Sequence, residues 1–377
     1  MTVFLILYIS IYLLMHAYAF YHAYRSLQFG RKTIALAALF SLFMVVSPIL
    51  VRLAERNGFE TGPRILAYVG YTWMGLLLLF VAVAFFYDVF ALGKWCVSAI
   101  RRKPFAMPIQ YRRRRFFVQL AIVLVMYGYG LYEANHIRTM HITISSPEIA
   151  RETGRLRVVQ ISDVHLGLIV GERRLAKILA KVREADPDLL VSTGDLVDGQ
   201  LNDLTAVEKM LTRVNPPFGK LAVTGNHEFY AGLPVALDFT KKAGFLMLRD
   251  EAITVNGISF VGVDDPASAR SVEKSEAKEL ALLRRQRRNV FTVLLKHRPM
   301  VNPKSVGLFD LQLSGHTHNG QIFPFNFFTW LTFRYPGGIN VLDYGYLYIS
   351  NGSGTWGPPI RFLAPPEVTI IDLVHGS

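Results

Sequence analysis

Apolar residues dominate four long stretches near the N-terminus, at residues 3–24, 33–51, 65–87 and 116–134. A helix of about 20 apolar residues crosses the hydrocarbon core of a bilayer, which is about 30 Å thick. The pattern therefore predicts two to four membrane-spanning helices, with four as the best count. Together they form a membrane anchor over residues 1–137.

From residue 155 onward, short apolar runs alternate with stretches of helical periodicity. Helices are predicted at residues 172–184, 202–214, 233–243 and 272–287. Strands are predicted at residues 156–162, 188–193, 220–224, 290–295, 311–314, 347–350 and 368–373, with a hairpin at 253–263 that turns at Asn256-Gly257. This alternation indicates a layered α/β domain over residues 155–377. Residues 138–154 are expected to form a connector between the anchor and this domain.

The composition agrees with a membrane protein. Hydrophobic residues make up 51% of the chain and charged residues 18%, whereas a soluble domain usually has about 25% charged residues. The net charge is +13, and residues 1–150 contribute most of it, with 15 Lys and Arg against 5 Asp and Glu. Because this excess lies among the apolar segments, it favours membrane topology over nucleic-acid binding. Cys96 is the only cysteine, which excludes a disulfide scaffold.

The basic residues also predict an orientation. Loops 25–32 and 93–115 together hold eleven Lys and Arg residues, and the intervening loop 52–64 holds three. The positive-inside rule places the first two loops in the cytoplasm. With four spans, the N-terminus and the C-terminal domain lie on the other side. The sequence thus predicts a multi-pass protein of the cell (inner) membrane with an extracytoplasmic domain.

Polar side chains follow five of the predicted strands. In α/β sheets the carboxyl ends of the strands meet at one edge, where ligands bind. The nitrogen and oxygen donors predicted to meet there are Asp163, His165, Asp195, Asn226, His297, His316 and His318. Seven donors are too many for one zinc ion and suit two divalent cations that share a carboxylate. The mixture of nitrogen and oxygen without a thiolate fits Mn, Fe or Zn better than copper or an iron–sulfur cluster.

The order of these motifs resembles the calcineurin-like metallophosphoesterases. The blocks are Asp-x-His at 163–165, Gly-Asp-x-x-Asp at 194–198, Gly-Asn-His-Glu at 225–228, the single His297, and Gly-His-x-His at 315–318. The tail at 351–367 is similar to a subgroup of bacterial membrane-bound or exported phosphoesterases. The resemblance implies a four-layer α/β/β/α domain with a binuclear metal centre.

The resemblance also implies a role for each residue. One metal would be bound by Asp163, His165 and His318, the other by Asn226, His297 and His316, with Asp195 bridging both. His227 matches the histidine that lies beside the phosphate, where it would stabilise the transition state or protonate the leaving oxygen. Asp198 would orient a ligand, and Glu228 receives no role. Asn319 stands where the subgroup usually has glycine, and no loss of activity is expected from this difference.

The sequence therefore predicts a membrane-anchored phosphoesterase. Metal-activated hydroxide would hydrolyse a phosphate ester, a phosphodiester or a pyrophosphate, and the substrate could be lipid-linked. Two alternatives remain open. One is the UDP-2,3-diacylglucosamine pyrophosphatase of lipid A synthesis, whose cytoplasmic substrate conflicts with the predicted topology. The other is a membrane sensor or binding module that holds a phosphate ligand without turnover.

The expected partners are the phosphate-ester or lipid-linked substrate and the lipids of the membrane, and a nucleic-acid partner is not expected. An aromatic segment at residues 323–335 has two interpretations. It could form an apolar wall that touches the bilayer or accepts acyl chains, or it could pack beneath a loop. The sequence leaves the substrate, the metal identity and the oligomeric state open.

Overall fold

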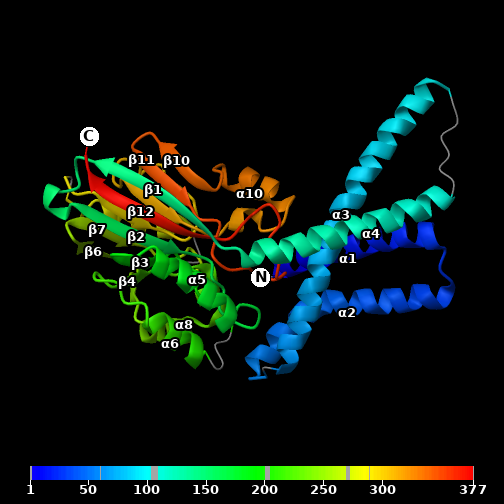
Figure 1. The fold of residues 1–377 in the computed structure, drawn as a ribbon, viewed down its shortest axis with the longest axis horizontal. Coiled ribbons are helices and arrows are strands. Elements are labelled where there is room, and N and C mark those ends of the chain that lie inside the picture. The colour runs from blue at the N-terminus through cyan, green and yellow to red at the C-terminus, as the bar shows by residue number, and fades with distance from the viewer. Residues whose placement is uncertain are drawn as a thin grey trace. The chain divides into compact units, whose positions relative to one another are not determined.

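The computed structural model describes residues 2–59, 61–102, 109–199, 204–268, 272–287 and 289–376. The chain divides into two compact units (Figure 1). The first unit consists of residues 1–131 and 357–360, and the second of residues 132–356 and 361–377.

The first unit is helical. Its helices are α1 (Thr2–Leu27), α2 (Arg31–Arg56), α3 (Thr61–Ile100) and α4 (Ile109–Asn135), the last of which ends within the second unit. All four are long and apolar enough to cross a membrane, which confirms the predicted set of four apolar helices. Helix α3 runs on to Ile100, well past the apolar run predicted at 65–87, because no proline interrupts residues 88–100.

Side chains of the first unit pack and form hydrogen bonds between its helices. Tyr12, Val45 and Leu77 form a buried cluster. The indole N–H of Trp73 on α3 donates to Nε2 of His16 on α1 over 2.8 Å. These contacts join α1, α2 and α3 into a bundle.

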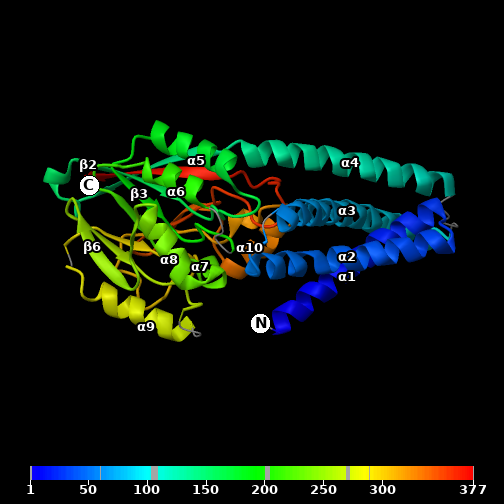
Figure 2. The same cartoon turned by 90° about the horizontal axis from the view of Figure 1, so that it is seen from below.

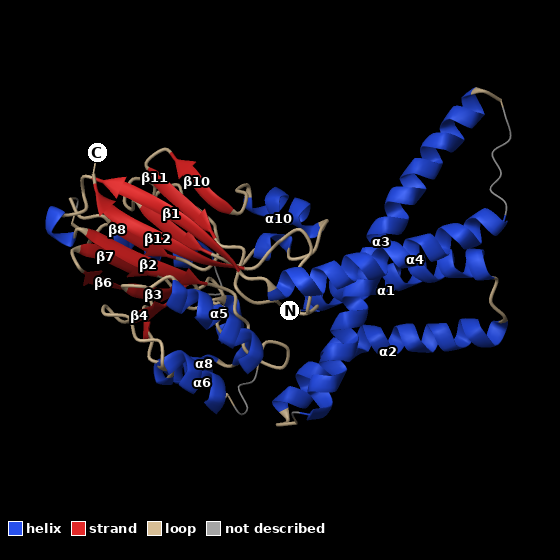
Figure 3. Ribbon diagram, in the orientation of Figure 1, coloured by secondary structure: helices blue, strands red, loops and turns tan. Residues whose placement is uncertain are grey.

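The second unit contains two six-stranded sheets, whose strands are red in Figure 3. The first sheet has the order β1-β12-β2-β3-β4-β5 and consists of β1 (Arg138–Ser146), β2 (Arg155–Ile161), β3 (Leu189–Ser192), β4 (Lys220–Ala222), β5 (Leu246–Met247) and β12 (Glu367–His375). The second has the order β10-β11-β9-β8-β7-β6 and consists of β6 (Glu251–Val255), β7 (Ile258–Gly262), β8 (Thr292–Leu295), β9 (Leu311–Ser314), β10 (Gly338–Leu342) and β11 (Gly345–Ile349). Strands β2, β3 and β4 run parallel, as do β7, β8 and β9, so their carboxyl ends lie at the same edges.

Helices cover the outer faces of both sheets and produce four layers. Alternate residues of β2 face opposite ways. Val159 and Ile161 pack in one core with helices α5 (Glu172–Glu184), α6 (Thr205–Thr212) and α8 (Leu233–Lys242), while Leu156 and Val158 pack against the second sheet. Helix α9 (Val272–Leu283) packs on the outer face of the second sheet, and Figure 2 shows it on the opposite side from α5. The α/β/β/α arrangement is therefore confirmed.

The structure corrects one expectation about the connector at 138–154. Residues 138–146 form strand β1, which pairs in parallel with β12 at the edge of the first sheet. The cause lies in the sequence, because Met140, Ile142 and Ile144 alternate with polar residues at the period of a strand. The rest of this segment, from 147 to 154, includes the short 3-10 helix η1 (Arg151–Thr153) and lies outside strands.

Candidate metal centre

The predicted residues follow the carboxyl ends of five strands, β2, β3, β4, β8 and β9. Five of them adopt a positive φ between 49° and 70°, namely Asp163, His165, Asp195, His316 and His318. A left-handed conformation in a residue other than glycine costs about 1–3 kcal/mol and often marks a functional site. The backbone thus accepts strain at the strand ends from which these side chains project.

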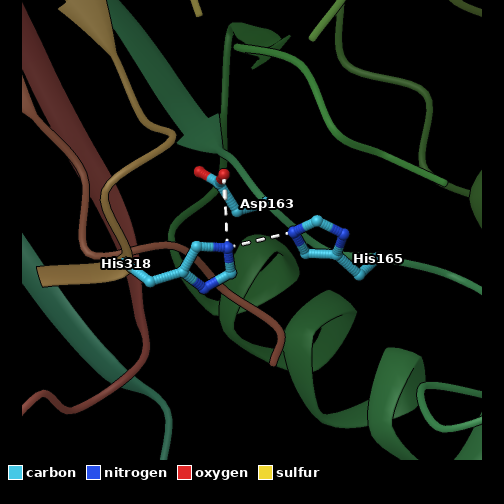
Figure 4. Close-up of side chains that lie close together, drawn as sticks. All are labelled: Asp163, His165 and His318. Carbon is cyan, nitrogen blue, oxygen red and sulfur yellow. Dashed lines mark hydrogen bonds and ion pairs between the residues drawn. The ribbon is translucent and has the colours of Figure 1, made fainter. Parts of the chain in front are cut away.

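The first cluster joins the ends of β2 and β9 (Figure 4). Nε2 of His318 lies 3.5 Å from Oδ1 of Asp163 and 3.0 Å from Nε2 of His165. Asp163 is held in place because the backbone N–H of His316 donates to both of its carboxylate oxygens over 3.0 Å. One carboxylate and two imidazoles therefore converge on a single point.

The second cluster joins the ends of β3, β8 and β9. Nε2 of His297 lies 3.2 Å from Oδ2 of Asp195 and 3.1 Å from Nδ1 of His316. The same Oδ2 atom lies 3.8 Å from Nε2 of His165, which belongs to the first cluster. The Asp195 carboxylate therefore lies between the two clusters.

Asn226 lies at the start of α7 (Asn226–Ala231), next to Asp195. The backbone N–H of the following residue, His227, donates to Oδ1 of Asp195 over 2.8 Å. Among the described residues, no hydrogen-bond donor reaches the buried Oδ1 atom of Asn226. A buried oxygen in this position is either costly or reserved for a ligand.

Gly194 permits the close approach of the strand ends. Its φ is +94°, and an added Cβ would lie only 2.7 Å from Gly225 N and from Nδ1 of His297. A side chain at this position would push the loops that carry Asp195 and Asn226 apart. The glycine is therefore required by both the turn and the packing.

Burial and neighbouring charges divide the histidines into two kinds. Burial lowers the pKa of His316 and of His318 well below the ordinary value, helped by the charges of His297 and Arg361 respectively. Burial also disfavours the charged form of His297, but Asp195 outweighs it and raises the pKa of His297 to about 10. His316 and His318 are thus neutral, whereas His297 shares a positive charge with Asp195 and would have to give up its Nε2 proton to bind a cation.

The two buried aspartates also differ. Burial raises the pKa of Asp163. In Asp195 burial acts in the same direction, but the charges of His297 and His227 outweigh it and hold the pKa well below the ordinary value. Asp195 is therefore the fixed negative charge of the site.

His227 is oriented by Asp198. Its Nδ1 atom lies 2.9 Å from Oδ1 of Asp198, and its ring packs edge-on against His165 with ring centroids 4.6 Å apart. Burial lowers the proton affinity of His227, but Asp195 and Asp198 outweigh it and raise the pKa to about 9. The two carboxylates thus favour the protonated form of His227, and Asp198 holds the Nδ1 edge of its ring.

Glu228 is a residue to which the sequence assigned no role, and the structure gives it one. Its buried carboxylate accepts hydrogen bonds from the backbone N–H groups of Gly225 (2.6 Å), Asp195 (3.0 Å) and Leu196 (2.8 Å). Glu228 thus clamps the loop after β3 to the loop after β4. The Gly-Asn-His-Glu block contained this residue, but its partners become visible only in the fold.

Arg361 is the second residue that sequence reasoning missed. It is completely buried, and it donates to the backbone oxygens of His318 (2.9 Å), Asn351 (2.7 Å) and Gly354 (2.6 Å). Its Nη2 atom also lies 3.1 Å from Nδ1 of His318, on the ring edge opposite the first cluster. Arg361 therefore fixes both the backbone and the ring of a predicted metal ligand.

The clusters fit divalent cations. The donor atoms of Asp163, His165 and His318 lie within 4.8 Å of one another, as do those of Asp195, His297 and His316. Two carboxylates, four imidazoles and the amide oxygen of Asn226 form a nitrogen and oxygen donor set, which suits Mn, Fe or Zn. His227 also groups with His165 and Asp195 at this distance, so it lies at the centre of the site.

Comparison with known proteins agrees with the geometry. The family model for calcineurin-like phosphoesterases matches residues 156–320. A protein of Aquifex aeolicus named "Uncharacterized metallophosphoesterase" is 38% identical over 255 residues, which cover 67% of this chain and 97% of that protein. A Campylobacter jejuni protein, also named as an uncharacterized metallophosphoesterase, is 31% identical, covering 81% of this chain and 83% of its own.

A similarity that extends into the helical unit is found in an animal protein. The "Transmembrane protein with metallophosphoesterase domain" of Danio rerio is 27% identical over 338 residues, which cover 83% of this chain and 75% of that protein. The motifs, the four-layer fold and the matches to these relatives agree with one another. The chain therefore belongs to the calcineurin-like metallophosphoesterases and is a phosphoesterase hydrolase.

Proposed function

We propose that this chain binds two divalent cations and uses them to hydrolyse a phosphate ester, a phosphodiester or a pyrophosphate at a membrane. Asp163, His165 and His318 hold one cation. Asn226, His297 and His316 hold the other, and Asp195 bridges the two. Mn, Fe and Zn are the candidate metals, given the donor set.

The position of Asp195 carries this proposal. Its Oδ2 atom lies 3.2 Å from Nε2 of His297 in one cluster and 3.8 Å from Nε2 of His165 in the other. A carboxylate between two sets of imidazoles is placed to bind both cations of a pair about 3.5–4 Å apart. A purely structural ion pair would need only one histidine beside the aspartate.

The chemistry follows from the placement of His227. Two bound cations supply positive charge for the phosphoryl oxygens and lower the pKa of water. The attacking water loses a proton to the solvent, and its oxygen forms a bond to phosphorus while the bond from phosphorus to the leaving oxygen breaks. His227, which groups with His165 and Asp195 at the centre of the site, donates its proton to the leaving oxygen. Asp198 holds the His227 ring in place.

We further propose that the four helices span a cell membrane and that the phosphoesterase domain is extracytoplasmic. The support is the excess of basic residues in loops 25–32 and 93–115 over loop 52–64. A C-terminal alkaline phosphatase fusion should be active and a C-terminal green fluorescent protein fusion dark. The reverse result would place the domain in the cytoplasm, where the pyrophosphatase of lipid A synthesis would find its substrate.

Hydrolysis by the full-length protein in detergent tests the activity. We expect the wild type to cleave bis-p-nitrophenyl phosphate in the presence of Mn²⁺. Asp195→Ala should lose both this activity and the bound metal. His227→Ala should retain its metal but lose about 10²–10⁴-fold in kcat. His141→Ala, which changes a largely exposed histidine of β1, serves as the matched control and should keep full activity. Equal residual rates in the wild type and both site variants would instead favour a binding module.

A further inference from the structure

The helix α10 (Phe325–Phe333) exposes most of its aromatic side chains. None of its nine residues is buried. Phe327 and Phe328 are each 54% exposed, Trp330 51% and Leu331 55%, and we call these four residues the α10 surface. This exposure contradicts the interpretation that the segment packs beneath a loop. Domains that stay in water seldom expose contiguous apolar patches of this kind.

Helix α10 contacts the metal centre at both of its ends. The ring of Phe333, at the end of α10, meets the ring of His316 edge-on, with centroids 5.6 Å apart. At the other end, Gly320 in the 3-10 helix η2 (His318–Gly320) lies against the backbone of Asn326 so closely that no Cβ would fit. Helix α10 is therefore fixed beside the site as an apolar wall.

The composition of α10 indicates a lipid occupant for this wall. The sequence Phe-Asn-Phe-Phe-Thr-Trp-Leu-Thr-Phe contains no charged residue. Phe and Trp are typical of helices that lie in the membrane interface. Arg334 follows directly as an exposed residue in the left-handed conformation, and its N–H donates to Trp330 O over 3.0 Å. An arginine at the end of an apolar helix can reach lipid phosphates while the helix lies among acyl chains.

A candidate membrane span, α4, directly precedes the domain that carries α10. Only His136 and Ile137 separate the end of α4, a candidate membrane span, from the start of β1. The three residue steps from Asn135 to Arg138 span at most about 11 Å. The domain that carries α10 is therefore tethered directly to a membrane-spanning segment.

We propose that the α10 surface inserts into the membrane interface and that the substrate is a phosphate ester of an amphiphile, whose alkyl chains lie along α10 while its phosphate reaches the metal centre. This inference rests on the proposed hydrolytic function and names the class of its substrate. Lipid at the interface and the chains of the substrate share one chemistry, a long hydrocarbon beside an anionic phosphate.

The first experiment measures where α10 lies and does not depend on activity. In a Cys96→Ser background, Phe328→Cys carries the fluorophore NBD, and Val235→Cys on α8, a residue 53% exposed, is the matched control. Both full-length proteins are reconstituted into phosphatidylethanolamine/phosphatidylglycerol vesicles with and without doxyl-labelled lipids. We expect blue-shifted, lipid-quenched emission at position 328 only. Equal emission at both positions, or a blue shift without lipid quenching as contact with protein would give, overturns the insertion.

The second experiment measures the choice of substrate with two esters that have the same reacting phosphodiester. Methyl and hexadecyl p-nitrophenyl phosphate both lose p-nitrophenolate to water and leave an alkyl phosphate. The wild type should prefer the hexadecyl ester at least tenfold in kcat/KM. The triple variant Phe327→Ser, Phe328→Ser, Trp330→Ser should lose this preference while its rate on the methyl ester changes less than twofold.

The control for this assay removes exposed apolar residues elsewhere on the domain, with Phe218→Ser, Val235→Ser and Leu246→Ser. It should keep the preference for the hexadecyl ester. Equal rates on both esters in the wild type, or an unchanged preference in the α10 variant, overturn the amphiphile as substrate. Cleavage of neither ester would instead count against the hydrolytic function itself, and the lipid quenching would still decide the position of α10.

Discussion

The clamp formed by Glu228 leads to a quantitative prediction for Glu228→Gln. Oε2 accepts from the N–H groups of Gly225 and Asp195, and Oε1 accepts from those of Leu196 (2.8 Å) and Val197 (3.4 Å). Glutamine has almost the same shape but only one acceptor oxygen. Whichever way the amide turns, two backbone donors lose their acceptor and face an NH₂ group instead.

The cost follows from these two donors. A buried donor without an acceptor costs about 1–3 kcal/mol, so the two cost about 2–6 kcal/mol. Burial and the charge of Asp195 raise the pKa of Glu228 to about 7, so the neutral amide avoids part of the cost of a buried charge. The lower half of the range, about 2–4 kcal/mol, is therefore expected. For a domain of about 150–250 residues this lowers Tm by roughly 4–16 °C.

Circular dichroism melts and metal analysis of the full-length protein test this prediction. The control is Glu184→Gln at an exposed side chain whose ion pair with Lys181 contributes about 1 kcal/mol or less. We expect a clear loss of Tm and of bound metal for Glu228→Gln only. If that variant melts within 1 °C of the wild type and keeps its metal, the clamp has no energetic role and the reasoning from its hydrogen bonds is wrong.

Three further predictions concern the support of the site. Arg361→Lys should lower Tm and metal content, because lysine reaches fewer of the carbonyls that the guanidinium holds, and metal titration followed by melting measures both. Leu190→Ala, in the core beneath α5, should lower the free energy of unfolding by about 2–5 kcal/mol, as chemical denaturation measures it, and leave the kcat of the folded fraction unchanged. A changed kcat would contradict a purely packing role for Leu190. Chelation with EDTA should abolish activity and lower Tm. Adding Mn²⁺ at about 1,000 times its Kd should then raise the free energy of unfolding by about 4 kcal/mol. If neither treatment changes Tm, no cation stabilises the folded state.

The convergence of the site was predictable because each strand end was marked in the sequence. A parallel sheet places the carboxyl ends of its strands together, so the end of each apolar run predicts where the next polar residue lies. His297 illustrates this, since its Nδ1 atom lies 2.9 Å from the carbonyl oxygen of Thr193, a residue 104 positions earlier. The hairpin at Asn256-Gly257 was equally predictable, because this dipeptide favours a tight turn.

The supporting residues were not predictable in the same way. Glu228 accepts from backbone groups about 30 positions away, and Arg361 donates to the carbonyl of His318, which is 43 positions earlier. Backbone donors and acceptors look alike at every position of a sequence, so such partners emerge only from the fold. Strand β1 is a different case, because its alternation was present in the sequence and a connector was expected in its place.

Helix α10 shows a third kind of limit. The segment contains no charged residue, and its three polar residues, Asn326, Thr329 and Thr332, lie among aromatic ones, so the sequence does not tell a buried helix from an exposed one. Only the exposed fractions of Phe327, Phe328 and Trp330 decide between the two interpretations.

The most direct test of the two-cation centre is anomalous diffraction from crystals of the full-length protein grown with Mn²⁺. Two anomalous peaks about 3.5–4 Å apart should flank the Asp195 carboxylate, one beside Asp163 and the other beside His297. A protein that hydrolyses bis-p-nitrophenyl phosphate but shows one peak, or peaks remote from Asp195, would contradict the account.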